Sequence, residues 1–461
     1  MTPRGTRFRL FPQAGAEFRE PERVILSPPA GSLAPGPRDD RMFAILPAMP
    51  KPPYEPPGYL PPFTGAVLPP AMPDALGHFD HIDVDAPQFL AAHLYGAARF
   101  TLDVWERYLG HRLRWWHADF LPQLELIATV DWNNAHSGPG FVETGTRLNA
   151  RGEPNHFCLN LDVVAHELGH AIVFSKVGVP TPGRLTAQYL AFHETMADLV
   201  ALITALHFDS VVDRFLAEAW GNLYALSLVN RVGEMSAVEQ IRAVDFHARV
   251  DSFRGFRLRA DGSFEDPTGT ARTQHQLSQP LTAAIFAALI EIYQDVLVRE
   301  GVIVPDDDTR GWTPEEVTAD LDLLLARGGR NFDQLRPQFH AALHAARDWT
   351  GFALARLLDR VRADDMSFAA IAAHFLAIAT ETGGADNALA FALCFTERDI
   401  EVGDAAPRRT PRRRRRSYLE RMLTGEHQRA LVAVAGRPGR LDDVSALRRM
   451  MPHSFRTEPR W

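Results

Sequence analysis

The stretch LDVVAHELGHAIVF, residues 161–174, decides how the rest of the chain is interpreted. Its apolar pattern predicts a helix over residues 162–177, because a glycine and then a proline follow at positions typical of a helix end. Residues four apart lie on one face of a helix, so His166 and His170 can reach the same ion. Glu167 is turned by about 100° from His166, which places its carboxylate beside such an ion.

Two imidazole nitrogens suit Zn²⁺, which needs a third protein ligand and, in a catalytic site, an open fourth position for water. The next helical stretch, about residues 186–206, contains the segment FHETMADLVALI. Glu194 lies in this segment 24 residues after His170, and Asp198 follows one turn later on the same face. We therefore expect Glu194 to be the third zinc ligand and Asp198 to hydrogen-bond a ligating imidazole.

A bare His pair in a helix is only moderately specific for zinc, since such pairs also arise by chance. A solvated acidic stripe is the alternative interpretation of Glu194 and Asp198. Apolar neighbours such as Ala197, Leu199 and Val200 disfavour it, because a buried pair of carboxylates needs a cation. The sequence thus favours one catalytic zinc ion.

These motifs, DVVAHELGHAI followed by HETMADL, resemble the thermolysin-like group of the gluzincin metallopeptidases. The resemblance covers about residues 76–402. It implies an α+β fold of zincin type with two lobes: an N-terminal mixed sheet and helix lobe, a central metal-binding helix, and a mainly helical C-terminal lobe. It also implies hydrolysis of peptide bonds, with Glu167 as the general base.

Three further positions match residues that act on the substrate in this group. The segment TVDWNNAHSGPGFV resembles the group's edge strand, which implies that Asn134 and Ala135 hold the substrate backbone. The segment HQLSQPLTAAIF resembles its His-x-x-Ser segment, which implies that His275 stabilises the tetrahedral oxyanion. Val163 matches a residue lining the primed-side pocket, which implies cleavage before bulky hydrophobic residues.

The sequence departs from the group at several positions. Leu185 stands where the group has a tyrosine that shares oxyanion stabilisation, and Thr270 stands where an aspartate orients the histidine, with Asp266 as a possible substitute. Asp162 matches a calcium-ligand position, but the acidic cluster that should follow is absent, which argues against structural Ca²⁺. Because losing one oxyanion donor costs about 10²–10³ in turnover, we expect a slow or specialised peptidase.

Other zinc peptidases are excluded at their distinguishing residues. A metzincin needs a third histidine six residues after the second, where this chain has Lys176. The Gly-x-Met-Glu-Asn segment expected of a gluzincin aminopeptidase is missing. Endopeptidase is therefore the expected activity.

The remaining chain is divided by composition into four regions. Residues 1–75 are interpreted as a proline-rich arm or linker, since 18 of the 34 prolines fall in the first 73 residues; the arm is either a partly disordered extension or a segment crossing the cleft. Residues 76–180 form the expected N-terminal lobe and residues 181–405 the C-terminal lobe. Residues 406–461 form a basic tail.

Partners and location follow from charge and apolar content. The tail contains five consecutive arginines, Arg412 to Arg416, which could bind nucleic acid or an anionic surface, although a solvated tail is favoured. Two cysteines, Cys158 and Cys394, are too few for a disulfide framework. The start of the chain lacks a signal peptide, and the longest apolar run, residues 281–290, is too short for a membrane span. We expect a cytoplasmic protein, with leaderless export as the alternative.

Two non-catalytic functions remain open. The protein could be an interaction protein that uses zinc as a brace, or an effector that acts through its arginine-rich tail. Glu167 opposes the first, because a structural zinc site needs neither a base nor an open coordination position. The sequence does not predict an oligomeric state.

Overall fold

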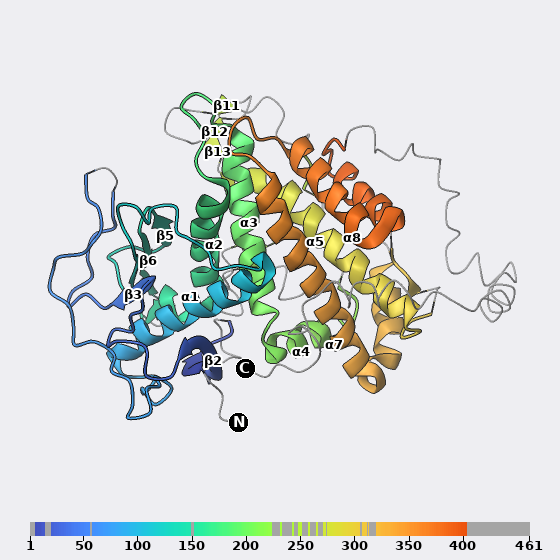
Figure 1. Cartoon of the computed structure of the whole chain (residues 1–461). Helices are drawn as coiled ribbons and strands as arrows, with labels where there is room; N and C mark the ends of the chain where they lie inside the picture. The colour runs from blue at the N-terminus through green and yellow to red at the C-terminus, as the bar shows by residue number, and fades with distance from the viewer. Residues whose placement is uncertain are drawn as a thin grey trace, which may run out of the picture.

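The computed structural model describes most of the first 402 residues: 5–13, 20–55, 58–148, 152–223, 231–232, 242–243, 248–250, 257–258, 264–265, 271–272, 274–304, 307–310, 312 and 320–402. Strands predominate in the N-terminal part and helices in the C-terminal part, so the fold is mixed α+β as predicted (Figure 1). The two parts meet where the helix bearing HELGH packs against its successor.

An antiparallel hairpin opens the chain, formed by β1 (Gly5–Leu10) and β2 (Glu22–Pro29). It packs against the long helix α1 (Pro87–Leu109), where Phe8 and Leu10 of β1 are fully buried. Gly96 of α1 permits this approach, because a Cβ there would lie 2.8 Å from Leu10 Cδ2. The hairpin is thus an integral part of the N-terminal core.

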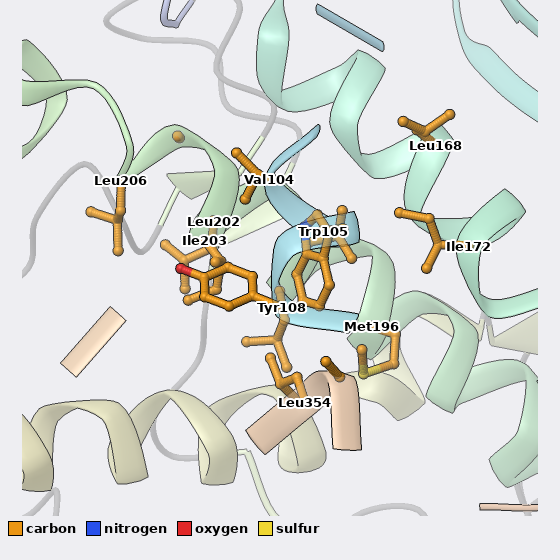
Figure 2. Close-up of a cluster of buried hydrophobic side chains, with 14 of the residues drawn as sticks. Val104, Trp105, Tyr108, Leu168, Ile172, Met196, Leu202, Ile203, Leu206 and Leu354 are labelled. Atoms are coloured by element: carbon orange, nitrogen blue, oxygen red, sulfur yellow. The ribbon is translucent and has the colours of Figure 1, made fainter. Parts of the chain in front are cut away.

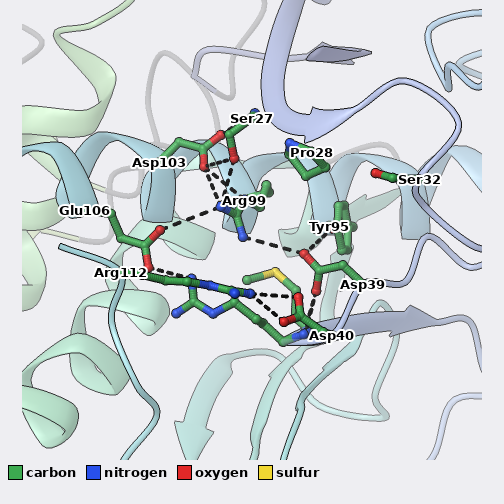
Figure 3. A network of polar contacts seen from close by, with 12 residues as sticks. Ser27, Pro28, Ser32, Asp39, Asp40, Tyr95, Arg99, Asp103, Glu106 and Arg112 are labelled. Atoms are coloured by element: carbon green, nitrogen blue, oxygen red, sulfur yellow. Dashed lines mark hydrogen bonds and ion pairs between the residues drawn. The ribbon is translucent and has the colours of Figure 1, made fainter. Parts of the chain in front are cut away.

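A polar network joins the same hairpin to α1 (Figure 3). The Asp103 carboxylate accepts hydrogen bonds from the backbone N–H (2.8 Å) and hydroxyl (2.7 Å) of Ser27 in β2. Arg99 pairs with Asp103 at 2.8 Å and approaches Asp39 at 3.5 Å and Glu106 at 3.6 Å. A buried guanidinium surrounded by carboxylates is tolerated because each charge has a partner of opposite sign.

A four-stranded sheet follows, in the order β3-β4-β6-β5. β3 runs parallel to β4 and β4 parallel to β6, while β5 is antiparallel to β6 and forms one edge. Alternate residues of β3, β4 and β6, such as Leu126 and Val142, belong to the large core that includes α1 and the helix bearing HELGH. The strands are β3 (Met42–Ile45), β4 (Leu124–Ile127), β5 (Ala135–Gly138) and β6 (Phe141–Thr144).

The proline-rich segment covers the opposite face of this sheet. Tyr54 packs with Ile127 and Phe141, and Phe63 lies against the same cluster. The interpretation of residues 1–75 as an arm or linker is therefore wrong for the described residues, which supply a hairpin, a sheet strand and this cover. Proline content alone was a poor guide to this segment. It pairs through isolated bridges and side-chain hydrogen bonds, and short strands interrupted by proline can still form these contacts.

A second hairpin leads into the helix bearing HELGH. It consists of β7 (Thr146–Leu148) and β8 (Pro154–His156) and is followed by the short 3₁₀ helix η1 (Phe157–Leu159), α2 (Leu161–Val177) and α3 (Ala187–Ala205). α2 and α3 lie unusually close, because Gly169 has no side chain where Ala197 approaches. A Cβ on Gly169 would lie 2.8 Å from Ala197 Cα.

Side chains of α1, α2 and α3 pack together with Leu354 in the core that fixes α2 against α3 (Figure 2). α1 contributes Trp105, which is fully buried, and its indole N–H donates to Thr204 Oγ1 of α3 at 3.3 Å. The labelled members of this core are Val104, Trp105, Tyr108, Leu168, Ile172, Met196, Leu202, Ile203, Leu206 and Leu354. Burial of this many large apolar side chains makes the α2–α3 geometry rigid.

The C-terminal part is helical, with α5 in contact with α3, α7 and α8. By length and hydropathy α5 could cross a membrane, but 78% of its most apolar window is buried inside the protein, as in a core helix. The helices are α4 (Asp209–Glu218), α5 (Gln274–Arg299), α7 (Leu321–Arg360) and α8 (Phe368–Thr396). Short strands precede α5: β9 (Arg231–Val232), β10 (Arg242–Ala243), β11 (Arg257–Leu258), β12 (Phe264–Glu265) and β13 (Ala271–Arg272).

Candidate metal centre

Three side chains converge between α2 and α3. Ligand atoms of His166, His170 and Glu194 all lie within 4.8 Å of one another. His166 Nε2 is 3.5 Å from Glu194 Oε2, and His170 Nε2 is 3.9 Å from Glu194 Oε1. Two ligands bound tetrahedrally to zinc at about 2.0–2.1 Å lie about 3.3 Å apart, so this arrangement fits one Zn²⁺ after small side-chain shifts. Among the residues that the structure describes, this is the one His/Cys/Asp/Glu group of that kind.

The capped start of α2 positions the two histidines. Asn160 caps α2, because its side-chain oxygen accepts the backbone N–H groups of Asp162 and Val163 at 3.0 and 3.4 Å. One turn of helix then separates His166 from His170, whose rings lie 4.8 Å apart at 89°. The predicted helical spacing therefore places both imidazoles on one face.

Charge around Glu194 keeps this carboxylate ionised. Burial would raise its pKa, but the nearby charge of His170 and hydrogen bonds from His166 and His275 outweigh burial and lower the pKa. An ionised carboxylate among imidazoles is the donor set that Zn²⁺ prefers in a site with one acidic ligand.

Asp198 lies where the sequence predicts a partner for a ligand. Its Oδ1 is 2.9 Å from Nδ1 of His166, and both side chains are buried. A carboxylate on Nδ1 holds the proton there and leaves Nε2 as the nitrogen that faces Glu194. Asp198 thus orients His166.

Solvent reaches the centre from one side. The side chain of His170 is 16% exposed and that of His275 is 41% exposed, whereas His166 is 4% exposed. Glu167, the predicted base, follows His166 on α2 and is buried. The centre is therefore anchored in the core but open toward His170, as a site that must admit water and substrate requires.

His275 lies in the first turn of α5 and contacts the centre directly. Its Nδ1 is 2.6 Å from Glu194 Oε2. The structure thus brings this residue to the site, although sequence motifs alone left its distance from the two helices open. The contact of His275 with Glu194 could not be predicted from the sequence, because it depends on the packing of α5 against α3.

The positions where the chain departs from the thermolysin-like pattern are only partly described. Leu185 is 43% exposed, and the nearest tyrosine in sequence, Tyr189, donates its hydroxyl to the carbonyl of Gly178 at 2.7 Å. Tyr189 also contacts His193, whose pKa burial lowers to about 4. Thr270 and Asp266 lie outside the described residues.

The predicted peptide-binding residues lie at the open edge of the sheet. Ala135 begins β5 and forms a small apolar cluster with Val163 of α2 and Phe157 of η1. Asn134 immediately precedes the strand and is exposed, and its carbonyl accepts the N–H of Gly145 at 2.8 Å. The structure therefore places the edge strand beside the metal helix.

The predicted calcium-ligand position is occupied differently. Asp162 is buried in the first turn of α2, and Gln13 Nε2 donates to its Oδ2 at 3.2 Å. The N-terminal segment after β1 thus supplies a partner for this carboxylate. Both cysteines are buried and free, and burial raises the pKa of Cys158 to about 12.

Comparisons with known proteins identify no family. No protein-family model matches this chain, and no curated protein sequence matches it. Among solved structures, the chain is similar to the precursor of protealysin, a metalloproteinase from Serratia proteamaculans, at 13% sequence identity and a TM-score of 0.35. The match covers 82% of this chain and 90% of that one. A TM-score of this size carries no argument, so the function is inferred from the residues of the site itself.

Proposed function

We propose that this protein is a zinc-dependent endopeptidase. The proposal rests on one observation: His166, His170 and Glu194, from two helices locked together at Gly169, converge within ligand distance of a single ion. The buried Asp198 contact and the solvent-exposed side of the centre are what a catalytic zinc site needs. A zincin-type two-lobed arrangement and the thermolysin-like resemblance are part of this proposal.

Zinc, when bound, acts as a Lewis acid that polarises the peptide carbonyl and lowers the pKa of water to about 7. Glu167 accepts the proton of the attacking water and returns it to the leaving amine. His275 donates a hydrogen bond to the oxygen that becomes negative in the transition state. Asn134 and Ala135 hold the substrate chain along β5, and the apolar contact of Ala135 with Val163 favours a bulky hydrophobic residue on the primed side.

The test is cleavage of a quenched fluorescent peptide library by the purified full-length chain. We expect cleavage before hydrophobic residues, loss of activity with a zinc chelator, recovery on adding Zn²⁺, and one zinc per chain by atomic absorption. A chain that binds one zinc but cleaves no peptide in the library would instead be a zinc-braced interaction protein. The alternative of an effector acting through its arginine-rich tail concerns Arg412 to Arg416, which lie outside the described residues. The cytoplasmic location also stays a prediction.

His275→Ala is expected to lower kcat by about 10²–10³ while changing KM little, because an oxyanion donor acts in the transition state. The measurement is steady-state kinetics on one cleaved peptide, with zinc content determined in parallel. Because His275 also contacts Glu194, a variant that loses zinc together with activity would show that its role is to hold the ligand. A pure KM effect would assign it to substrate binding.

A further inference from the structure

A buried charged cluster lies on the outer face of the sheet, on the side opposite α2. Its centre is Glu143 of β6, whose side chain is fully buried. The carboxylate accepts hydrogen bonds from Lys51 Nζ at 2.5 Å and from the backbone N–H of Tyr54 at 2.6 Å. It also contacts Nε2 of His136. None of these groups takes part in the chemistry proposed above.

Lys51 is the residue that joins this cluster to the proline-rich cover. It is 3% exposed, and its ammonium lies 3.6 Å from the centre of the Tyr54 ring. Its carbonyl accepts the N–H of Asp131 at 2.8 Å, next to a parallel bridge between Lys51 and Val130. Lys51 therefore contacts β6 through the side chain of Glu143. Through its backbone it also contacts the stretch that leads into β5.

β5 depends on this cluster for its position. It is four residues long, and among the described strands it pairs with β6 alone. His136 of β5 stands directly opposite Glu143 in the antiparallel register and also bonds it through its side chain. A shift of one residue would turn Ala135 away from Val163 and His136 away from Glu143, since side chains alternate along a strand.

Burial and charge explain why a lysine is needed. Burial would raise the pKa of Glu143, but His136 and Lys51 outweigh it and lower the pKa, so the carboxylate stays charged. Without the ammonium, Glu143 would have to take up a proton or draw in water, because an unpaired buried charge is unfavourable. Either change weakens the contact that holds His136.

We infer that Lys51 is a positioning residue for the peptide-binding edge: through Glu143 and His136 it fixes the register and place of β5, and so determines how tightly an extended peptide binds. The inference rests on the proposed function, in which substrate lies along β5. It assigns a role in substrate binding to the proline-rich segment.

Lys51→Met is expected to speed amide hydrogen exchange in residues 132–138, where the edge loses its anchor, and to leave exchange in α2 unchanged. For an extended peptide, KM is expected to rise on the order of tenfold, as for the loss of about one hydrogen bond to the peptide backbone. The value of kcat and the zinc content should stay close to those of the unaltered protein.

Tyr54→Phe is the matched control. Tyr54 lies in the same segment and is as deeply buried, but its hydroxyl donates to Glu125 at 2.8 Å and not to Glu143. This variant should leave exchange in residues 132–138 and KM unchanged. His136→Ala breaks the last link but leaves Glu143 paired with Lys51, so no unpaired carboxylate remains in the core. It should reproduce the effects of Lys51→Met if that variant folds poorly.

Two results would overturn the inference. One is unchanged exchange in residues 132–138, or an equal rise over the whole sheet and α2, which would make Lys51 a general stabilising residue. The other is a lower kcat at unchanged KM. If the unaltered protein cleaves no peptide, the proposed function fails and the peptide-binding role fails with it, whereas the exchange experiment still decides whether Lys51 holds β5.

Discussion

Glu167→Gln is expected to stop peptide cleavage while the protein keeps one zinc per chain. The amide has nearly the shape of the carboxylate, so α2 and its two histidines should stay in place around the buried side chain. An amide cannot take a proton from water at neutral pH, and loss of a general base costs about 10²–10⁴ in rate. Because Glu167 is also proposed to protonate the leaving amine, we expect a loss at the upper end of that range. The measurement is kcat on a cleaved peptide beside zinc content.

Glu291→Gln supplies the matched control for that variant. Glu291 is another buried glutamate, farther along α5 from His275, and no role in the chemistry is proposed for it. It should retain activity, which would show that a buried Glu→Gln change alone does not inactivate the enzyme. Cleavage retained by Glu167→Gln would assign the base elsewhere. Loss of zinc from that variant would mean that Glu167 supports the metal site instead.

The metal centre could be predicted because most of its geometry is local. Helical periodicity alone places His166 beside His170 and Glu194 one turn before Asp198. Bringing the two pairs together needs α2 to pack on α3, and the glycine inside HELGH is the residue that makes this possible. The local pattern and the tertiary contact therefore depend on the same segment of sequence.

The outer part of the fold could not be predicted, because its contacts join residues far apart in the chain. Met42 pairs with Leu124, and Lys51 meets Glu143 across 92 positions. Short strands among prolines carry little periodic signal, so composition favoured an arm over a sheet strand and its cover.

Glu194→Ala is expected to abolish both zinc binding and activity. Glu194 is the single anionic residue among the three ligand candidates, and it also contacts His275. Without it, two neutral imidazoles on one helix face remain, which bind zinc far more weakly than a three-ligand site. Zinc binding stabilises a folded protein by about 2.7 kcal/mol at a hundredfold excess over Kd. The unaltered protein should therefore show a rise in Tm with zinc that Glu194→Ala lacks.

Asp198→Ala tests a residue that is proposed to orient a zinc ligand and not to bind zinc itself. Asp198 contacts Nδ1 of His166, and removing such a partner typically weakens metal affinity by about 10–100-fold. Competition with a chromogenic chelator should then rank zinc affinity as unaltered protein, Asp198→Ala, Glu194→Ala, from tight to weak. Equal affinity in Glu194→Ala and the unaltered protein would remove Glu194 from the ligand set. The proposed centre of His166, His170 and Glu194 would then be wrong, and the peptidase proposal, which depends on it, would fall.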